Sequence, residues 1–210
     1  MREQLTDLRS TRNPKARIKI MEGHFATVNS HINMSTVKCR HNNGRETARV
    51  LAEHFRNNTM VDTIVCLDGT EVIGAFMAEF LSDRGIMSIN SGNNISIITP
   101  DVNAYGQLVF MDSTIRMIKN MQALVLAASV TTGRTIAQAV EAVSYYGGTV
   151  GGVAAIFSNV EQTPEEMEIF SIFHKEDLPD YQAYQPSECP MCRRKQPLDA
   201  IVNSFGYSKL

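Results

Sequence analysis

The sequence predicts an α/β fold with a mostly parallel β-sheet flanked by helices, and three observations support this prediction. Apolar runs of strand length alternate with segments of helical spacing along much of the chain. The run Ala123–Ala128 is apolar throughout, which is typical of a strand buried on both faces of a parallel sheet. Strands that alternate with helices are joined by right-handed crossovers, so we expect ligands to bind at the carboxyl ends of the strands.

Before Ala123–Ala128, the sequence predicts a helix, a strand and a second helix. Apolar residues recur at helical spacing over Thr47–Phe55. The β-branched run Thr63–Leu67 predicts a buried strand, and a turn leads from it into a helix over Glu71–Leu81. Weaker extended stretches cover Ile95–Ile98 and Gln107–Phe110.

After Ala123–Ala128, the alternation of helix and strand continues. Helical spacing runs from Thr135 to Tyr146, and Gly147-Gly148 ends the helix. Val150–Phe157 and Glu168–Phe173 then predict two further strands.

The composition limits the classes of partner. The chain has 210 residues, is 43% hydrophobic and carries a formal net charge of −2, which suits one well-packed domain and gives no reason to expect nucleic acid as a partner. No apolar stretch reaches the length of a membrane span, and the N-terminus lacks the apolar core of a signal peptide. We therefore expect a cytoplasmic protein that does not bind a membrane.

A polar turn joins Ala123–Ala128 to the following helix, and its residues suit an anion. This turn, residues 129–135, holds one serine, three threonines, a glycine and an arginine, and we call it the cup. Free backbone amides, hydroxyls and the helix dipole favour an anion such as phosphate at a helix N-terminus. In the alternative interpretation, the threonines only cap the helix. A second polar turn, Asp68-Gly69-Thr70, follows a neighbouring strand, and we expect both turns to face one pocket.

Four ordered segments resemble one enzyme family. Leu124–Thr135 resembles the phosphoribosyl-pyrophosphate loop of the type I phosphoribosyltransferases. In the orotate branch of that family, Gly23–His31 is similar to a segment near the base site, and Thr63–Ala75 takes the place of the pyrophosphate loop and its helix. Glu168–Tyr181 resembles the last core strand and the helix after it. The Cys-Pro-x-Cys tail is similar to that of a bacterial group of orotate phosphoribosyltransferase-like proteins.

The resemblance implies a fold and an assembly. The expected fold is the Rossmann-like sheet of the type I phosphoribosyltransferases, with a small N-terminal hood and an irregular C-terminal tail. The implied division is a hood over residues 1–60, an α/β core over residues 61–175 and a tail over residues 176–210, together forming one globular domain. The resemblance also implies a homodimer.

The implied reaction transfers phosphoribosyl from phosphoribosyl pyrophosphate, bound with Mg²⁺, to a base. Three groups of residues are carried over by position, and no catalytic residue is assigned. They are Ser129, Thr131, Thr132, Gly133, Arg134 and Thr135 at the 5-phosphate, Leu67, Asp68, Gly69 and Thr70 at the pyrophosphate, and His24, Phe25 and His31 at the base. Alternatively, the two histidines are hydrogen-bonded structural residues.

Two departures from the family pattern weaken the expected chemistry. Ala127-Ala128 stands where the family has two acids, so nothing there accepts hydrogen bonds from the ribose diol. A hydrogen bond to a charged group contributes roughly 1.5–3 kcal/mol, so the loss of two weakens ribose binding by about two to four powers of ten. The segment Thr99–Gly106, in the place of the mobile loop, contains no lysine or arginine to neutralise a leaving pyrophosphate.

Two classes of function therefore stay open. The first is an orotate phosphoribosyltransferase-like enzyme with a modified ribose site. The second is a non-catalytic sensor that uses the cup to bind a phosphorylated ribose or a nucleotide. The sequence favours the transferase-like class by resemblance, with weak or absent activity on orotate.

A C-x-x-C pair in the tail suggests a metal site. Cys189 and Cys192 are spaced to bind one tetrahedral ion, and a structural Zn²⁺ is the candidate. Cys39 and His41 are the expected partners, with His174 as a further candidate. The alternatives are a redox pair and two ordinary surface thiols.

Overall fold

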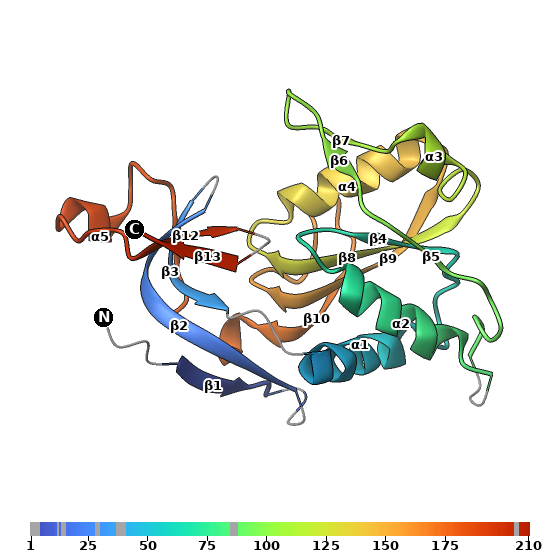
Figure 1. Ribbon diagram of the computed structural model, residues 1–210, viewed down its shortest axis with the longest axis horizontal. Coiled ribbons are helices and arrows are strands. Elements are labelled where there is room, and N and C mark those ends of the chain that lie inside the picture. The colour runs from blue at the N-terminus through green and yellow to red at the C-terminus, as the bar shows by residue number, and fades with distance from the viewer. Residues whose placement is uncertain are drawn as a thin grey trace. The chain divides into compact units, whose positions relative to one another are not determined.

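The computed structural model describes residues 5–11, 13, 16–27, 30–36, 41–84, 88–203 and 206–210. It divides the chain into two units, the first formed by residues 1–43 with 175–210 and the second by residues 44–174. Each unit has a β-sheet of its own (Figure 1).

A five-stranded sheet forms the centre of the second unit, in the order β5-β4-β8-β9-β10. Every neighbouring pair of strands is parallel, which confirms the predicted parallel sheet. Numbered along the chain, the five strands lie in the order 2-1-3-4-5, which is one of the common doubly wound orders. The strands are β4 (Thr63–Cys66), β5 (Ser96–Ile98), β8 (Gln122–Val130), β9 (Thr149–Ser158) and β10 (Ile169–His174).

Helices cover both faces of this sheet (Figure 1). Helix α4 (Arg134–Tyr145) packs on one face, where buried Ile136 and Val143 join the core made by β8 and β9. Helices α1 (His41–Phe55) and α2 (Glu71–Ser82) lie on the other face. The flanking helices confirm the predicted α/β class, and the predicted strands and helices agree with the structure to within a few residues at each end, apart from the earlier start of α1.

Shorter elements follow β5. Strands β6 (Asp101–Val102) and β7 (Leu108–Val109) pair as an antiparallel hairpin, and α3 (Asp112–Ile115) is a single helical turn. The hairpin contains the segment predicted to replace the mobile loop. At its tip the Asn103 side chain accepts hydrogen bonds from the backbone N–H groups of Tyr105 and Gln107.

The first unit combines both ends of the chain in one sheet. Strands β2 and β3 form a hairpin, β1 pairs antiparallel with β2, and β12 runs parallel to β2 and antiparallel to β13. The tail, expected to be irregular, thus contributes short regular elements to the sheet. The elements of this unit are β1 (Leu5–Arg9), β2 (Arg17–Ala26), β3 (His31–Thr36), the 3-10 turn η1 (Lys175–Asp177), β11 (Ala183–Tyr184), α5 (Pro190–Arg193), β12 (Ala200–Asn203) and β13 (Gly206–Lys209).

The predicted division into hood, core and tail stays a prediction, and so does the homodimer. Among the described residues, no helix is both long and apolar enough to cross a membrane.

The contact between α2 and β4 generates a prediction. A Cβ at Gly74 would lie 2.6 Å from the Sγ of Cys66, which is fully buried. Gly74→Ala gains about 1 kcal/mol in helix propensity but overpacks the interface, which costs about 1–3 kcal/mol. We expect urea denaturation to show a lower free energy of unfolding. Cys66→Ala in the same chain removes the sulfur and should recover part of the loss; a Gly74→Ala protein as stable as the wild type would contradict this account of the contact.

Candidate functional site

The cup lies where β8 ends and α4 begins. Gly133, at the N-cap of α4, has φ of 77° and ψ of −6°, a left-handed conformation that glycine adopts without strain. Within the described residues, no side chain caps this helix end. The first amides of α4 therefore remain available to a ligand, and the N-cap residue itself has no hydroxyl with which to cap them.

The cup surrounds a small hollow of about 40 Å³. One water molecule needs about 10–15 Å³ by this measure, so the hollow suits a group of a few heavy atoms, such as a phosphate. The side chains of Ser129, Thr132 and Thr135 are exposed and can donate hydroxyl hydrogen bonds. The hollow is lined by Asp68, Ala127, Ser129, Val130, Thr131, Thr132, Gly133, Arg134, Thr135 and Ile136.

A second turn reaches the same hollow from the neighbouring strand. Asp68 and Gly69 follow β4 with positive φ values of 57° and 74°, and Asp68 lines the hollow. A positive φ at an aspartate is uncommon, and such conformations concentrate at functional sites. The connections along the sheet reverse direction between the adjacent strands β4 and β8. The carboxyl ends of these two strands therefore form the topological switch point, where doubly wound sheets bind ligands.

The other two residues expected at the pyrophosphate are engaged within the fold. The hydroxyl of Thr70 donates to the carbonyl oxygens of Leu67 at 2.8 Å and Leu126 at 3.1 Å. The Leu67 side chain is 4% exposed. Of the predicted pyrophosphate loop, Asp68 and Gly69 are the exposed positions.

The alanine pair forms part of the sheet core and the edge of the hollow. Ala127 is 1% exposed, pairs with Ala155 of β9 and lines the hollow, whereas Ala128 is half-buried. Neither side chain can accept a hydrogen bond, so the expected contact to a ribose diol has no acceptor at these two positions.

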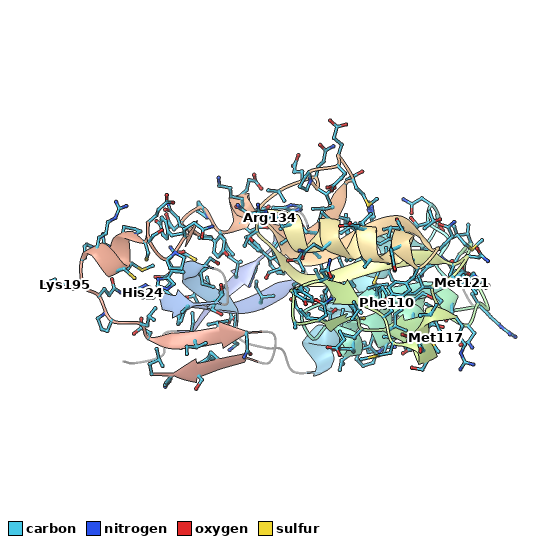
Figure 2. The ribbon with its side chains drawn as sticks, turned by 90° about the horizontal axis from the view of Figure 1, so that it is seen from above. His24, Phe110, Met117, Met121, Arg134 and Lys195 are labelled. Atoms are coloured by element: carbon cyan, nitrogen blue, oxygen red, sulfur yellow. The ribbon has the colours of Figure 1, made fainter. Side chains whose placement is uncertain are left out.

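A wider, more open depression of about 640 Å³ runs along the outer side of α4. It shares Arg134 with the cup, and Figure 2 shows this side chain at the first turn of the helix. Glu141 and Glu165 also line the depression, so its acidic groups oppose an anion there. The cup is therefore the better candidate for a phosphate site.

A separate cluster in the first unit unites two histidines with the C-x-x-C pair. His24 Nε2 lies 3.2 Å from His31 Nδ1, 3.5 Å from Cys189 Sγ and 3.6 Å from Cys192 Sγ, and Cys192 Sγ lies 3.2 Å from His31 Nδ1. His24 and Cys189 are fully buried. Partial burial and the neighbouring His24 lower the pKa of His31, which favours its neutral ring.

The cluster changes how several predicted residues are interpreted. His24 and His31 were expected at the base site, and Phe25 is a core residue of the first unit, packed with Met21 and Ile32. The base site at these positions stays a prediction. The four clustered ligand atoms lie within 4.8 Å of one another, and four is the number that a tetrahedral zinc site needs.

The structure describes two of the three other expected zinc partners. Cys39 is outside the described residues, and His41 is the first residue of α1. His174 belongs to the second unit, where its Nδ1 lies 3.0 Å from the Ser171 hydroxyl.

Comparison with known proteins gives one sequence relative and several weak structural likenesses. No model of a known protein family matches the chain. A curated relative, orotate phosphoribosyltransferase of Chlorobaculum parvum, is 32% identical over 83 residues. This match covers 38% of the chain and 39% of the relative, so the chain spans about two fifths of that protein's length.

Two of the structural likenesses are to phosphoribosyltransferases that act on different bases. Orotate phosphoribosyltransferase of Mycobacterium tuberculosis, in complex with phosphoribosyl pyrophosphate, is 18% identical with a TM-score of 0.48 over 66% of this chain and 77% of that one. A hypoxanthine-guanine phosphoribosyltransferase of Bacillus anthracis is 13% identical with a TM-score of 0.43 over 68% of this chain and 83% of that one. Scores at this level are too low to carry an inference about function.

The exposed hydroxyls of the cup generate a prediction. Thr132→Val together with Thr135→Val removes two hydroxyl donors to a phosphate, and each such bond contributes roughly 1.5–3 kcal/mol. We expect the affinity for ribose 5-phosphate to fall by about two to four powers of ten, with the melting temperature of the free protein nearly unchanged. Isothermal titration calorimetry measures this. Thr149→Val, an exposed threonine at the opposite end of the sheet, is the matched control. Equal affinity in the double variant and the wild type would rule out these hydroxyls as phosphate donors.

Proposed function

We propose that this chain binds a phosphoribosyl ligand in the cup and acts as an orotate phosphoribosyltransferase-like transferase. The proposed reaction moves phosphoribosyl from phosphoribosyl pyrophosphate to a base. One observation carries the proposal: the cup and Asp68, from the turn after the neighbouring strand, line one hollow at the switch point of a parallel sheet.

The charge and geometry of the cup support a phosphate monoester as its ligand. The uncapped N-terminus of the 12-residue helix α4 presents backbone donors and the positive end of its dipole. Hydroxyls of the cup and the exposed Arg134 add further donors. The curated relative supports phosphoribosyl, among phosphate ligands, because its name assigns it phosphoribosyl transfer to orotate.

The negative charge of Asp68 means that a cation is needed for pyrophosphate to bind beside it. Its carboxylate lies at the hollow, where it repels a pyrophosphate unless a positive charge lies between them. The residues present fit Mg²⁺, since Asp68 offers a carboxylate oxygen and the ligand itself supplies phosphate oxygens. Mg²⁺ would offset the charge of the pyrophosphate as it leaves. A structural Zn²⁺ in the first unit completes the proposed cofactors.

The proposal also covers partners and location. The ligand is a small molecule, and neither the charge of the chain nor its described helices suggest nucleic acid or a membrane as partner. We propose a cytoplasmic location, from the composition and apolar pattern of the sequence, and a homodimer, which the family resemblance implies.

Ligand titration tests the function directly. We expect calorimetry to show binding of phosphoribosyl pyrophosphate that strengthens with Mg²⁺, and slow release of pyrophosphate when orotate is added. Binding without pyrophosphate release for orotate or any other base would assign the chain to the alternative class, a sensor of phosphorylated ribose. No binding of phosphoribosyl pyrophosphate, ribose 5-phosphate or a nucleoside monophosphate would overturn the proposal.

The alanine pair generates a second test. Ala128→Asp restores a carboxylate at the half-buried position of the pair, where the family has an acid. We expect Mg²⁺-dependent affinity for phosphoribosyl pyrophosphate to rise by about one to two powers of ten, the value of one hydrogen bond to a charged group. Ala128→Asn, which keeps the size without the charge, is the control. Ala127→Asp is less suitable because it buries a carboxylate and destabilises the fold. Unchanged affinity in Ala128→Asp would refute the role given to the missing acids.

A further inference from the structure

We infer that His24, His31, Cys189 and Cys192 form a structural Zn²⁺ site within the first unit. The four ligand atoms lie within 4.8 Å of one another and come from β2, β3 and both ends of the Cys189–Cys192 segment. The thiols are more than 150 residues away in sequence from the histidines, with separations such as 165 between His24 and Cys189. The fold therefore brings together residues that the sequence keeps far apart.

The distances fit a tetrahedron around zinc. With Zn–S bonds near 2.3 Å and Zn–N bonds of about 2.0–2.1 Å, the edges of such a tetrahedron are about 3.3 Å between nitrogens and about 3.5 Å between nitrogen and sulfur. The nitrogen pair of the cluster is separated by 3.2 Å, and its three measured nitrogen–sulfur distances are 3.2, 3.5 and 3.6 Å. Four edges thus already have the lengths that a bound ion requires.

Hydrogen bonding alone does not account for the contacts at His24. Its Nδ1 lies 3.0 Å from the carbonyl oxygen of Gln196 and 3.2 Å from that of Pro197. Carbonyl oxygens only accept, so Nδ1 carries the proton and Nε2 is left with one lone pair. Nε2 nevertheless has three close neighbours, the two sulfurs and His31 Nδ1. One lone pair serves one hydrogen-bond donor, whereas a central cation explains all of these approaches.

The same backbone carbonyls act as outer partners of the site. A histidine that binds a metal through one nitrogen usually donates its other N–H to a carbonyl or carboxylate, which fixes the ring. In His24, the Nδ1–H group is directed at the carbonyl oxygens of Gln196 and Pro197, which accept the hydrogen bond. The backbone of His24 also exchanges hydrogen bonds with Asp199, through both its N–H and its carbonyl oxygen.

The ligand set selects the ion and its role. Two thiolates and two imidazoles in a tetrahedral arrangement suit Zn²⁺, and two thiolates balance its charge. All four positions are filled by the protein, which leaves no open position for a substrate. The ion therefore stabilises the fold: it ties the four-residue helix α5, which is too short to be stable alone, to the hairpin of β2 and β3 (Figure 2).

Metal analysis tests the site without any phosphoribosyl ligand. We expect protein purified without a histidine tag to contain about one zinc ion per chain. A chelator should remove the zinc and lower the melting temperature by several degrees. Cobalt added to the metal-free protein should give the absorption of a tetrahedral site with thiolate charge-transfer bands, a readout that needs no variant.

Substitutions then identify the ligands. Cys192→Ser changes the exposed ligand and should lose zinc while keeping the fold. Cys39→Ser should retain zinc, and so should Cys66→Ala, since burial in the other unit raises the pKa of the Cys66 thiol to about 12. Zinc loss on Cys39→Ser would refute this ligand set, and so would zinc retained on Cys192→Ser. A wild-type protein with a Cys189–Cys192 disulfide, or one that binds neither zinc nor cobalt, would overturn the inference. None of these outcomes depends on whether the cup binds a phosphoribosyl ligand.

Discussion

The parallel pairing of β4 with β8 is the constraint on which the candidate site depends. Thr63 to Cys66 pairs in register with Ala123 to Leu126, so the two strands end at the same edge of the sheet. From β4 the chain crosses to β5 at one side of the sheet, and it then returns past β4 to β8. The connections that follow β4 and β8 therefore leave in opposite directions, and a gap stays open at the carboxyl ends of these two strands. Asp68 and the cup lie in this gap, because no crossover helix runs between the turn after β4 and the turn after β8. A different strand order would separate them.

This arrangement divides the proposed ligand site into parts of unequal strength. The proposed phosphate side combines backbone donors, at a left-handed glycine and a helix end that no described side chain caps, with small hydroxyl side chains. The backbone donors depend on the fold, whereas the hydroxyls depend on the side chains at these positions. The ribose and pyrophosphate sides depend on carboxylates and cations, and here the chain has Ala127, Ala128 and a hairpin without lysine or arginine over residues 99–106. We therefore expect the phosphate to supply most of the affinity.

The sequence predicted the parts of the fold that local patterns determine. Apolar runs marked β4, β8, β9 and β10 because much of each strand is buried, from all of β4 to the second half of β9, and helical spacing marked α2 and α4. The position of the cup could also be predicted, since hydroxyl residues and glycine at a strand-to-helix turn form a local motif. The grouping of His24 and His31 with the C-x-x-C pair was missed. A hairpin between the two histidines was the available signal, but nothing local indicates that the tail returns to that hairpin.

The two units differ in how much apolar core they have, which gives a physical reason for the Zn²⁺ site proposed in the first one. The second unit has a sheet covered on both faces and a large apolar core. The first unit holds a smaller cluster around Met21, Phe25, Ile32 and Ala200, and its sheet is completed by the short tail strands β12 and β13. Units with little apolar area to bury commonly rely on a metal or disulfides. The segment from Cys189 to Asp199 reaches β2 through hydrogen bonds at His24 and through the thiols beside its ring. The proposed Zn²⁺ at that ring would therefore fix the position from which β12 begins.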